Sequence, residues 1–316
     1  MSHLCSTKSN NILVIADLEG AIGVDSIEDL KACIENRLNE LLALYDVLGE
    51  ALGYNLFYGD CHDGMLEDRI PKTCVNLKYC RSLWEIDFSI RYDCAILLGF
   101  HAKNNTMGFL AHSFRPEIEE FFISDRKTGE IQFFVNLLAY YFIPTVLICG
   151  DIGAVEDCKE ITCAKHSVKG LDGKNKKEMF DVMKDFKKVL YESVLNGERY
   201  LTNYDSCPIK ICFKSTIYSR VLGQCGFKLN NDNEIVIDST LECFRKFPLI
   251  GVALNVFRIQ RRADNVDNLR KALLKQLDYY NLDHGDRMTI EQCLLQDKQH
   301  INTPSVGHFL GGRYEG

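Results

Sequence analysis

The segment NILVIADLEG at residues 11–20 decides which fold we expect for this chain. Its apolar run has the length of a strand and lacks polar alternation, which is typical of a strand buried on both faces of a parallel sheet. Three comparable runs follow it, NLFYGDCHDG at 55–64, CAILLGFHA at 94–102 and PTVLICGD at 144–151. Ligands of such sheets bind beyond the carboxyl ends of the strands, so we expect a single cleft at that edge.

The stretches between these runs predict helices. Residues 28–52 carry Leu and Ile at three- and four-residue intervals, as an amphipathic helix does. Before the fourth run, residues 116–132 predict a short strand, a turn at 127–129 and the start of a helix that reaches about Tyr141. Strands that alternate with helices predict an α/β fold, in which a mostly parallel sheet has helices on both faces.

Three parts of the chain are distinguished by their composition. Residues 1–200 are expected to form the α/β domain that carries the candidate metal ligands. Residues 201–280 predict a smaller α+β section, suited to oligomerisation or substrate enclosure. Residues 281–316 are polar and predict a loosely held tail.

The second half of the chain reads less regularly than the first. Residues 155–200 are charged and predict mainly helix. The smaller section then contains two expected strands, PIKICFKS at 208–215 and NEIVIDS at 233–239, and an expected helix at 239–260.

Composition excludes several classes of protein. The 316 residues are 46% hydrophobic, so the chain can bury a large core. A formal charge of −7 and the lack of a basic stripe argue against nucleic-acid binding. No apolar run approaches the roughly 20 residues of a membrane helix, and MSHLCSTKSN at 1–10 lacks the pattern of a signal peptide. We therefore expect a cytoplasmic protein that binds neither nucleic acid nor membrane.

The 14 cysteines do not indicate a disulfide framework. None are spaced as CxxC, and several lie inside apolar runs, such as Cys94 and Cys149. Buried thiols in a reducing compartment account for this pattern. Cys61 precedes His62, but neighbouring side chains of an extended segment point in opposite directions, which argues against a nucleophilic pair.

Five candidate metal ligands follow the apolar runs or open a helix. Asp17 and Glu19 are two residues apart, so an extended backbone points both carboxylates to one face, where they repel unless a metal or a basic pair holds them. No Lys or Arg is nearby in the sequence. His62 and His101 each follow a strand, and Glu130 opens a helix, where the helix dipole favours a carboxylate. Singly, each histidine is explained as a loop residue and Glu130 as a helix-start charge; jointly, the five favour a metal site.

This ligand set predicts two metal ions. An open catalytic zinc keeps about three protein ligands, whereas three carboxylates and two imidazoles can hold two divalent ions when one carboxylate bridges them. His112 lies in GFLAHSFR at 108–115, a polar segment that reads as a loop. Near a metal pair it could protonate a leaving amine or steady an oxyanion, and otherwise it is a plain loop histidine. A dinucleotide-binding site is disfavoured, because DLEGAIG does not form GxGxxG and its acids would repel a pyrophosphate.

Six fragments together resemble the DppA-type D-aminopeptidases, a family of zinc metallopeptidases. They are DLEG (17–20), GDCH (59–62), LLGFHA (97–102), AHS (111–113), SDRKTGE (124–130) and PTVLICGD (144–151).

The resemblance implies two zinc ions per chain. Asp17 would bridge them, Glu19 and His101 would complete one site, and His62 and Glu130 the other. It assigns the catalytic role to His112. It also implies removal of N-terminal D-residues from short peptides, and a ring-like homo-oligomer that encloses a chamber.

The chain also departs from the family pattern. The segment between Glu19 and His62 is shorter than expected, residues beyond about 280 have no clear counterpart, and Phe134 replaces a polar residue. Phe134 is four residues after Glu130 and would either line the substrate pocket or pack into the core.

We expect a dinuclear-zinc aminopeptidase that attacks short peptides with metal-bound hydroxide. Two alternatives stay open at this point. One is a metal-dependent amidohydrolase that acts on another small amide. The other is a metal-stabilised oligomeric binding or scaffold protein without turnover.

Overall fold

A computed structural model describes residues 9–26, 28–62, 64–175, 177–204 and 206–262. Its larger sheet has six strands in the order β3-β2-β1-β4-β7-β8, and each neighbouring pair is parallel. The strands are β1 (Asn11–Ala16), β2 (Asn55–Asp60), β3 (Leu77–Cys80), β4 (Cys94–Phe100), β7 (Thr145–Asp151) and β8 (Ala164–Lys169). This sheet confirms the predicted α/β class.

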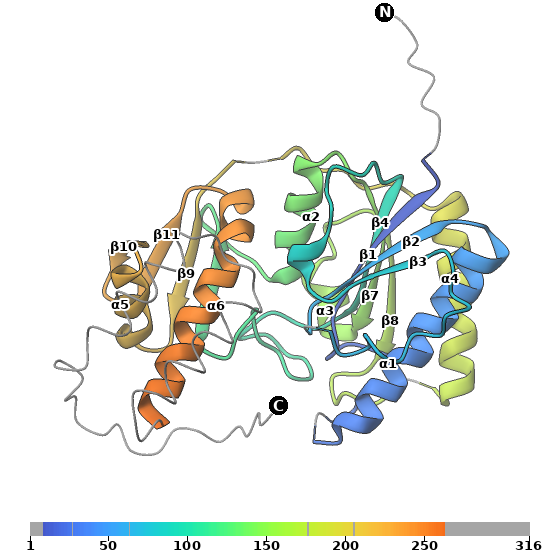
Figure 1. Ribbon diagram of the computed structural model, residues 1–316, viewed down its shortest axis with the longest axis horizontal. Coiled ribbons are helices and arrows are strands. Elements are labelled where there is room, and N and C mark those ends of the chain that lie inside the picture. Colours follow the sequence, from blue (N-terminus) through green and yellow to red (C-terminus); the bar gives the residue numbers. More distant parts are fainter. Residues whose placement is uncertain (1–8, 27, 63, 176, 205, 263–316) are drawn as a thin grey trace, which may run out of the picture. The chain divides into compact units, whose positions relative to one another are not determined.

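Helices cover this sheet (Figure 1). On one face, side chains of α1, its π-helical extension and α4 form a shared core with alternate residues of β1, β2 and β4. On α2, Phe134 packs against Phe100 of β4. The elements are α1 (Leu30–Leu44), the π-helical segment Tyr45–Ala51, α2 (Glu130–Tyr140), α3 (Ile152–Asp157) and α4 (Met179–Asn196). None of the helices in the described part of the chain combines the length and apolar character that a membrane crossing requires.

The second sheet has five strands in the order β10-β11-β9-β5-β6. The pairs β11–β9, β9–β5 and β5–β6 are antiparallel. The strands are β5 (Ile118–Ile123), β6 (Arg126–Lys127), β9 (Ile209–Phe213), β10 (Lys228–Asn231) and β11 (Glu234–Ile237), and two helices, α5 (Thr216–Gln224) and α6 (Thr240–Arg262), follow β9 and β11. The sheet therefore takes strands from both sides of residue 200.

Two local predictions are corrected. Residues 155–200 are not helix throughout, because β8 at Ala164–Lys169 separates α3 from α4. The turn expected at 127–129 lies earlier, since Ser124 adopts a φ of 57° between β5 and β6.

The chain divides into two compact units, one of Met1–Ser219 with Leu229–Arg245, and one of Arg220–Lys228 with Lys246–Gly316. The predicted domain boundary at 200/201 stays a prediction. The predicted tail at 281–316 lies outside the described residues.

The carboxyl edge of the larger sheet is packed so closely that Gly20 and Gly150 have no room for a side chain. A Cβ atom on Gly20 would lie 1.8 Å from the carbonyl oxygen of Phe100, and one on Gly150 would lie 2.0 Å from the same oxygen. Glycine therefore lets the segment after β1 and the end of β7 close around the end of β4. The strand order also reverses between β1 and β4, which is where open α/β sheets bind their ligands.

Candidate metal centre

The predicted ligands meet because three neighbouring parallel strands end at the same edge. Asp17 directly follows β1, His62 lies two residues beyond β2, and His101 directly follows β4. Since β2, β1 and β4 are adjacent, their carboxyl ends bring these side chains together. Glu130 is the first residue of α2, and His112 lies in the segment between β4 and β5. The predicted convergence in one place is thus present in the structure.

Asp17 lies between two histidines. Its Oδ1 is 3.0 Å from Nε2 of His62, and its Oδ2 is 3.3 Å from Nε2 of His101. Each imidazole has a second carboxylate partner. Glu19 Oε2 lies 3.1 Å from His62 Nε2, and Glu130 Oε1 lies 3.3 Å from His101 Nε2. The Asp17 carboxylate is therefore the only one of these three that contacts both imidazoles at these distances among the described residues.

Six candidate residues form two groups that could each hold a cation. We name them the Asp17 group, which contains Asp17, Glu19 and His62, and the His101 group, which contains His101, His112 and Glu130. Within each group, one ligand atom per residue lies within 4.8 Å of the others. The resemblance paired Glu19 with His101 and His62 with Glu130, whereas the side chains place Glu19 beside His62 and Glu130 beside His101. Which residues share one ion stays a prediction.

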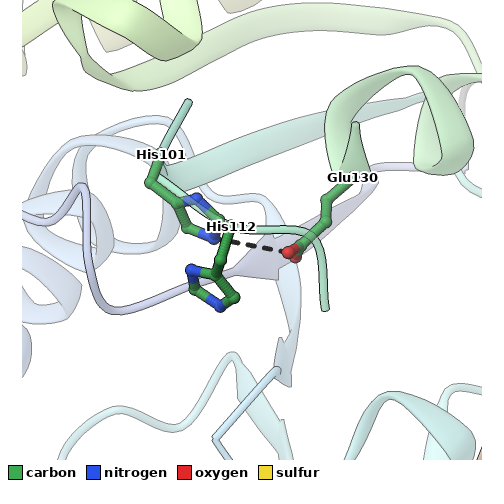
Figure 2. Close-up of side chains that lie close together, drawn as sticks. All are labelled: His101, His112 and Glu130. Carbon is green, nitrogen blue, oxygen red and sulfur yellow. Dashed lines mark ion pairs between the residues drawn. The ribbon is translucent and has the colours of Figure 1, made fainter. Parts of the chain in front are cut away.

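Backbone carbonyls orient both imidazoles of the His101 group. Nδ1 of His101 is 2.9 Å from the carbonyl oxygen of Ala102, and Nδ1 of His112 is 2.7 Å from that of Leu110. A nitrogen that donates to a carbonyl leaves Nε2 as the unprotonated atom of a neutral ring, which is the arrangement of metal-binding histidines. The two rings stack at 4.0 Å with an interplanar angle of 7°, and Figure 2 shows Glu130 directed at His101.

The site contains buried polar atoms that make no hydrogen bond among the described residues, namely Asp17 Oδ2 and His101 Nε2. Buried polar atoms are almost always hydrogen-bonded, so an uncompensated pair that faces each other needs another partner. A divalent cation would be that partner, because carboxylate oxygen and neutral imidazole nitrogen are zinc ligands. The residues present therefore fit zinc.

The carboxylates of the site raise the pKa values of His101 and His62. Burial lowers the pKa of His101, but the carboxylates of Glu130 and Asp17 outweigh it and raise this pKa to about 10. Burial likewise opposes the charge of His62, yet Glu19 and Asp17 raise its pKa well above the usual range. Both pKa shifts have the same cause, since the nearby carboxylates stabilise a positive charge on each imidazole.

The pKa values of Asp17 and Glu19 shift in opposite directions. Burial raises the pKa of Asp17, and the neighbouring Glu19 adds to the rise. Burial also opposes ionisation of Glu19, but His62 outweighs it and holds the pKa of Glu19 well below its ordinary value. A bound cation would favour the ionised form of both.

Several hydrogen bonds hold the candidate ligands and their backbone in place. The Oδ1 of Asp60 accepts from the backbone N–H of His62 at 2.8 Å, and the hydroxyl of Tyr79 donates to Oδ2 of Asp60. The backbone N–H of Phe114 donates to Glu130 Oε1. Phe114 has a φ of 58°, an uncommon value for a non-glycine residue, so the fold holds this amide in place at a local conformational cost.

Two buried cations near the site were missed by the sequence analysis, which found no basic residue nearby along the chain. Arg37 on α1 is 2% exposed and its Nη1 lies 2.7 Å from Oε2 of Glu40. Its charge also interacts with the carboxylates of Asp60 and Asp17. Lys169, the last residue of β8, is fully buried. In sequence, Arg37 looks like an exposed helix residue and Lys169 like part of a charged segment.

Phe134 does not line a pocket, so that interpretation is wrong. It is 2% exposed and its ring packs against those of Phe100 and Phe133 at centroid distances of 5.7 and 5.4 Å. The face of α2 that presents Glu130 at the edge turns into the core one turn later. Cys61 is also no nucleophile candidate, because burial raises the pKa of its thiol well above the ordinary value.

Comparisons with known proteins bear on the family resemblance. The D-aminopeptidase family model matches residues 85–219. The D-aminopeptidase of Bacillus subtilis (strain 168) is 33% identical over 67 residues, which are 21% of this chain and 24% of the relative's length. These matches confirm the resemblance to the D-aminopeptidase family.

A solved structure shares the fold. The Zn-dependent D-aminopeptidase DppA from Bacillus subtilis, described as a self-compartmentalizing protease, superposes with a TM-score of 0.66 at 16% identity, covering 81% of this chain and all of that one. The family match contains the His101 group, while the Asp17 group precedes it in the chain.

Proposed function

We propose that this chain, whose residues 85–219 match the D-aminopeptidase family, is a zinc-dependent aminopeptidase with two zinc ions per chain. One observation carries the proposal: the two oxygens of Asp17 face the Nε2 atoms of His62 and His101. A carboxylate placed between two imidazoles, each with its own second carboxylate, would suit a ligand shared by two metal ions.

Five residues would hold the zinc ions: Asp17, Glu19, His62, His101 and Glu130. When bound, zinc acts as a Lewis acid that polarises a carbonyl and lowers the pKa of water. The chain itself contributes a buried environment, since Asp17, Glu19 and His101 are 3%, 4% and 5% exposed. Burial keeps bulk water away and strengthens the interactions between the site and developing charge on a substrate.

His112 would move the proton. Its Nδ1 faces the carbonyl of Leu110, which leaves Nε2 to accept a proton from water and later to give it to the leaving amine. Its ring lies parallel to that of His101, so it is held beside the ligands and is half-exposed. Half exposure gives this side chain access to a substrate that the buried ligands lack.

The substrates we propose are short peptides that lose their N-terminal residue, including D-residues. We further propose a cytoplasmic homo-oligomer that encloses the site in a ring-like chamber. The solved relative with this fold is described as self-compartmentalizing, which supports assembly.

Purified protein tests the proposal directly. We expect elemental analysis to find close to two zinc ions per chain and a screen of D- and L-aminoacyl amides and dipeptides to show hydrolysis that a chelator abolishes. Hydrolysis of non-peptide amides alone would indicate a different amidohydrolase. Zinc binding without any turnover would indicate a metal-stabilised scaffold, and protein that binds no added zinc would contradict the mechanism.

A further inference from the structure

Lys169 is a buried lysine that the chemistry described above does not use. It ends β8, the edge strand of the larger sheet, and its side chain is fully buried. Lysine is almost never fully buried unless its ammonium group has partners. The partners of this one lie far from it in the sequence.

The ammonium group holds the segment that follows β1. Its Nζ donates to the carbonyl oxygen of Glu19 at 2.6 Å and to that of Val24. These two carbonyls bracket the loop between Glu19 and Val24. The backbone that carries the Glu19 carboxylate is therefore held by a residue of a distant strand. In the sheet, β4 and β7 lie between β1 and β8.

The same ammonium group also contacts the segment that carries His112. Its Nζ lies 4.4 Å from the centroid of the Phe109 ring, which is within the range of a cation–π interaction. Phe109 is three residues before His112. The ring also packs against Gly173, where an added Cβ would come within 2.3 Å of a ring carbon. The ring therefore contacts both the ammonium group and a backbone position that lacks a side chain.

The turn after Lys169 contributes a further tie. The side chain of Asn175 accepts a hydrogen bond from the backbone N–H of Gly23 at 3.0 Å, and Asn175 pairs with Lys169 through a β-bridge. Residues 169–175 therefore contact both the Glu19 segment and the His112 segment.

We propose that Lys169 is a positioning residue that fixes the Glu19 segment and the His112 segment relative to each other. The inference rests on the function proposed above. Lys169 sets where the Glu19 carboxylate meets a zinc ion and how far His112 stands from it. A methionine of similar length would fill the same space but would lack the three N–H donors and the positive charge.

The test compares Lys169→Met with Lys165→Met. Lys165 lies on the same strand and also donates to backbone carbonyls, those of Ile161 and Cys163, but it reaches neither segment. In metal-free protein, hydrogen exchange should become faster in peptides covering 19–24 and 105–112 of Lys169→Met alone. Equal exchange in the two variants overturns the inference.

Zinc affinity and kinetics give the second readout. Competition with a chelator should show zinc binding weakened about 10–100-fold in Lys169→Met, as for other residues that orient metal ligands. With zinc restored in excess, kcat should fall while KM stays close to that of the parent, because the proton-transfer geometry changes and substrate contacts do not. A fall in thermal stability with unchanged zinc affinity and kcat would overturn the inference, since it describes a merely structural lysine.

Phe109→Leu removes the contact to the His112 segment alone. It also replaces Lys169→Met as the test if that variant does not fold. It should speed exchange at 105–112 and lower kcat, with zinc affinity and exchange at 19–24 unchanged. Where both variants fold, the loss of kcat in the double variant should be smaller than the product of the single losses, because both remove one shared contact. The inference is overturned if the loss of kcat in the double variant equals the product of the two single losses. It is also overturned if Phe109→Leu has the kcat of the parent. A parent that neither binds zinc nor hydrolyses peptides overturns the proposed function and this inference with it.

Discussion

The Asp17 group and the His101 group lie side by side but are built differently. The Asp17 group comes from the ends of two adjacent strands and contains two carboxylates and one imidazole, whereas the His101 group comes from a strand end, a loop and a helix start and contains one carboxylate and two imidazoles. With neutral histidines the first carries two negative charges and the second one. The first group is suited to hold a cation, and the second adds an imidazole that can handle a proton.

The two groups also depend on different supports. Asp60, at the end of β2, holds the backbone of His62. In the His101 group, carbonyls of the connecting segment orient the rings, and the amide of Phe114 holds Glu130. The groups meet through Asp17 and His101. Variants in each group should therefore have separable effects, except at Asp17.

Replacing Asp17 should have the largest effect, because it serves both groups. We expect Asp17→Ala to lose both zinc ions and all measurable hydrolysis, while Asp46→Ala, which removes an exposed carboxylate paired with Lys187, retains both. Elemental analysis and kcat/KM measure the outcome. Two zinc ions retained in Asp17→Ala would show that Asp17 is not the bridge.

His112→Ala should come next. We expect kcat to fall about 10²–10⁴-fold, the usual contribution of a general acid–base group, with zinc content and folding unchanged. His166→Ala, on β8, is the matched control. Normal kcat would make His112 a plain loop residue, and loss of zinc would make it a ligand.

His62→Ala and His101→Ala compare the two groups directly, because each removes one imidazole from one group. Each should chiefly weaken one ion, because each imidazole faces Asp17 through a different oxygen. His101→Ala should lower kcat further when zinc is added in excess, since it also removes the ring that stacks on His112. Zinc titration followed by kinetics at saturating zinc distinguishes the two; identical behaviour would mean that the groups do not act separately.

The smallest effect concerns the stability of metal-free protein. The pKa of His101 is raised from 6.5 to about 10 by folding, so protonation stabilises the native state fully below pH 6.5 and this contribution is lost as pH rises through 10. We expect the Tm of chelator-treated protein to fall between these pH values and that of zinc-loaded protein to fall less. Because zinc displaces these protons, its affinity should rise with pH. A metal-free Tm that rises over this interval would contradict the charge distribution described for the site.

The strands at the centre of the sheet could be predicted because burial on both faces leaves continuous apolar runs. Such runs predict β1, β2, β4 and β7. β3 (LKYC) and β8 (AKHSVK) are edge strands with partly exposed residues, and their mixed polarity hides them.

Some residues of the site could likewise be predicted from the sequence, and others could not. Asp17, His62 and His101 could be predicted because they follow buried strands directly, and parallel pairing brings strand ends together. Arg37 and Lys169 could not, because only the three-dimensional packing removes them from solvent. The partners within each group depend on side-chain directions at the edge, which local sequence does not determine.

The close packing of Gly20 and Gly150 around the Phe100 carbonyl has a practical consequence for laboratory evolution of this chain. A library that randomises the whole carboxyl edge would consist largely of misfolded clones, because every side chain at those two positions collides with a main-chain oxygen of the neighbouring strand. Diversity aimed at new substrates belongs instead around Met107, which is 75% exposed, with Phe109 and Leu110 kept because they position His112. The strand ends are then a constant frame, and the connecting loop is the part of the gene that selection can explore.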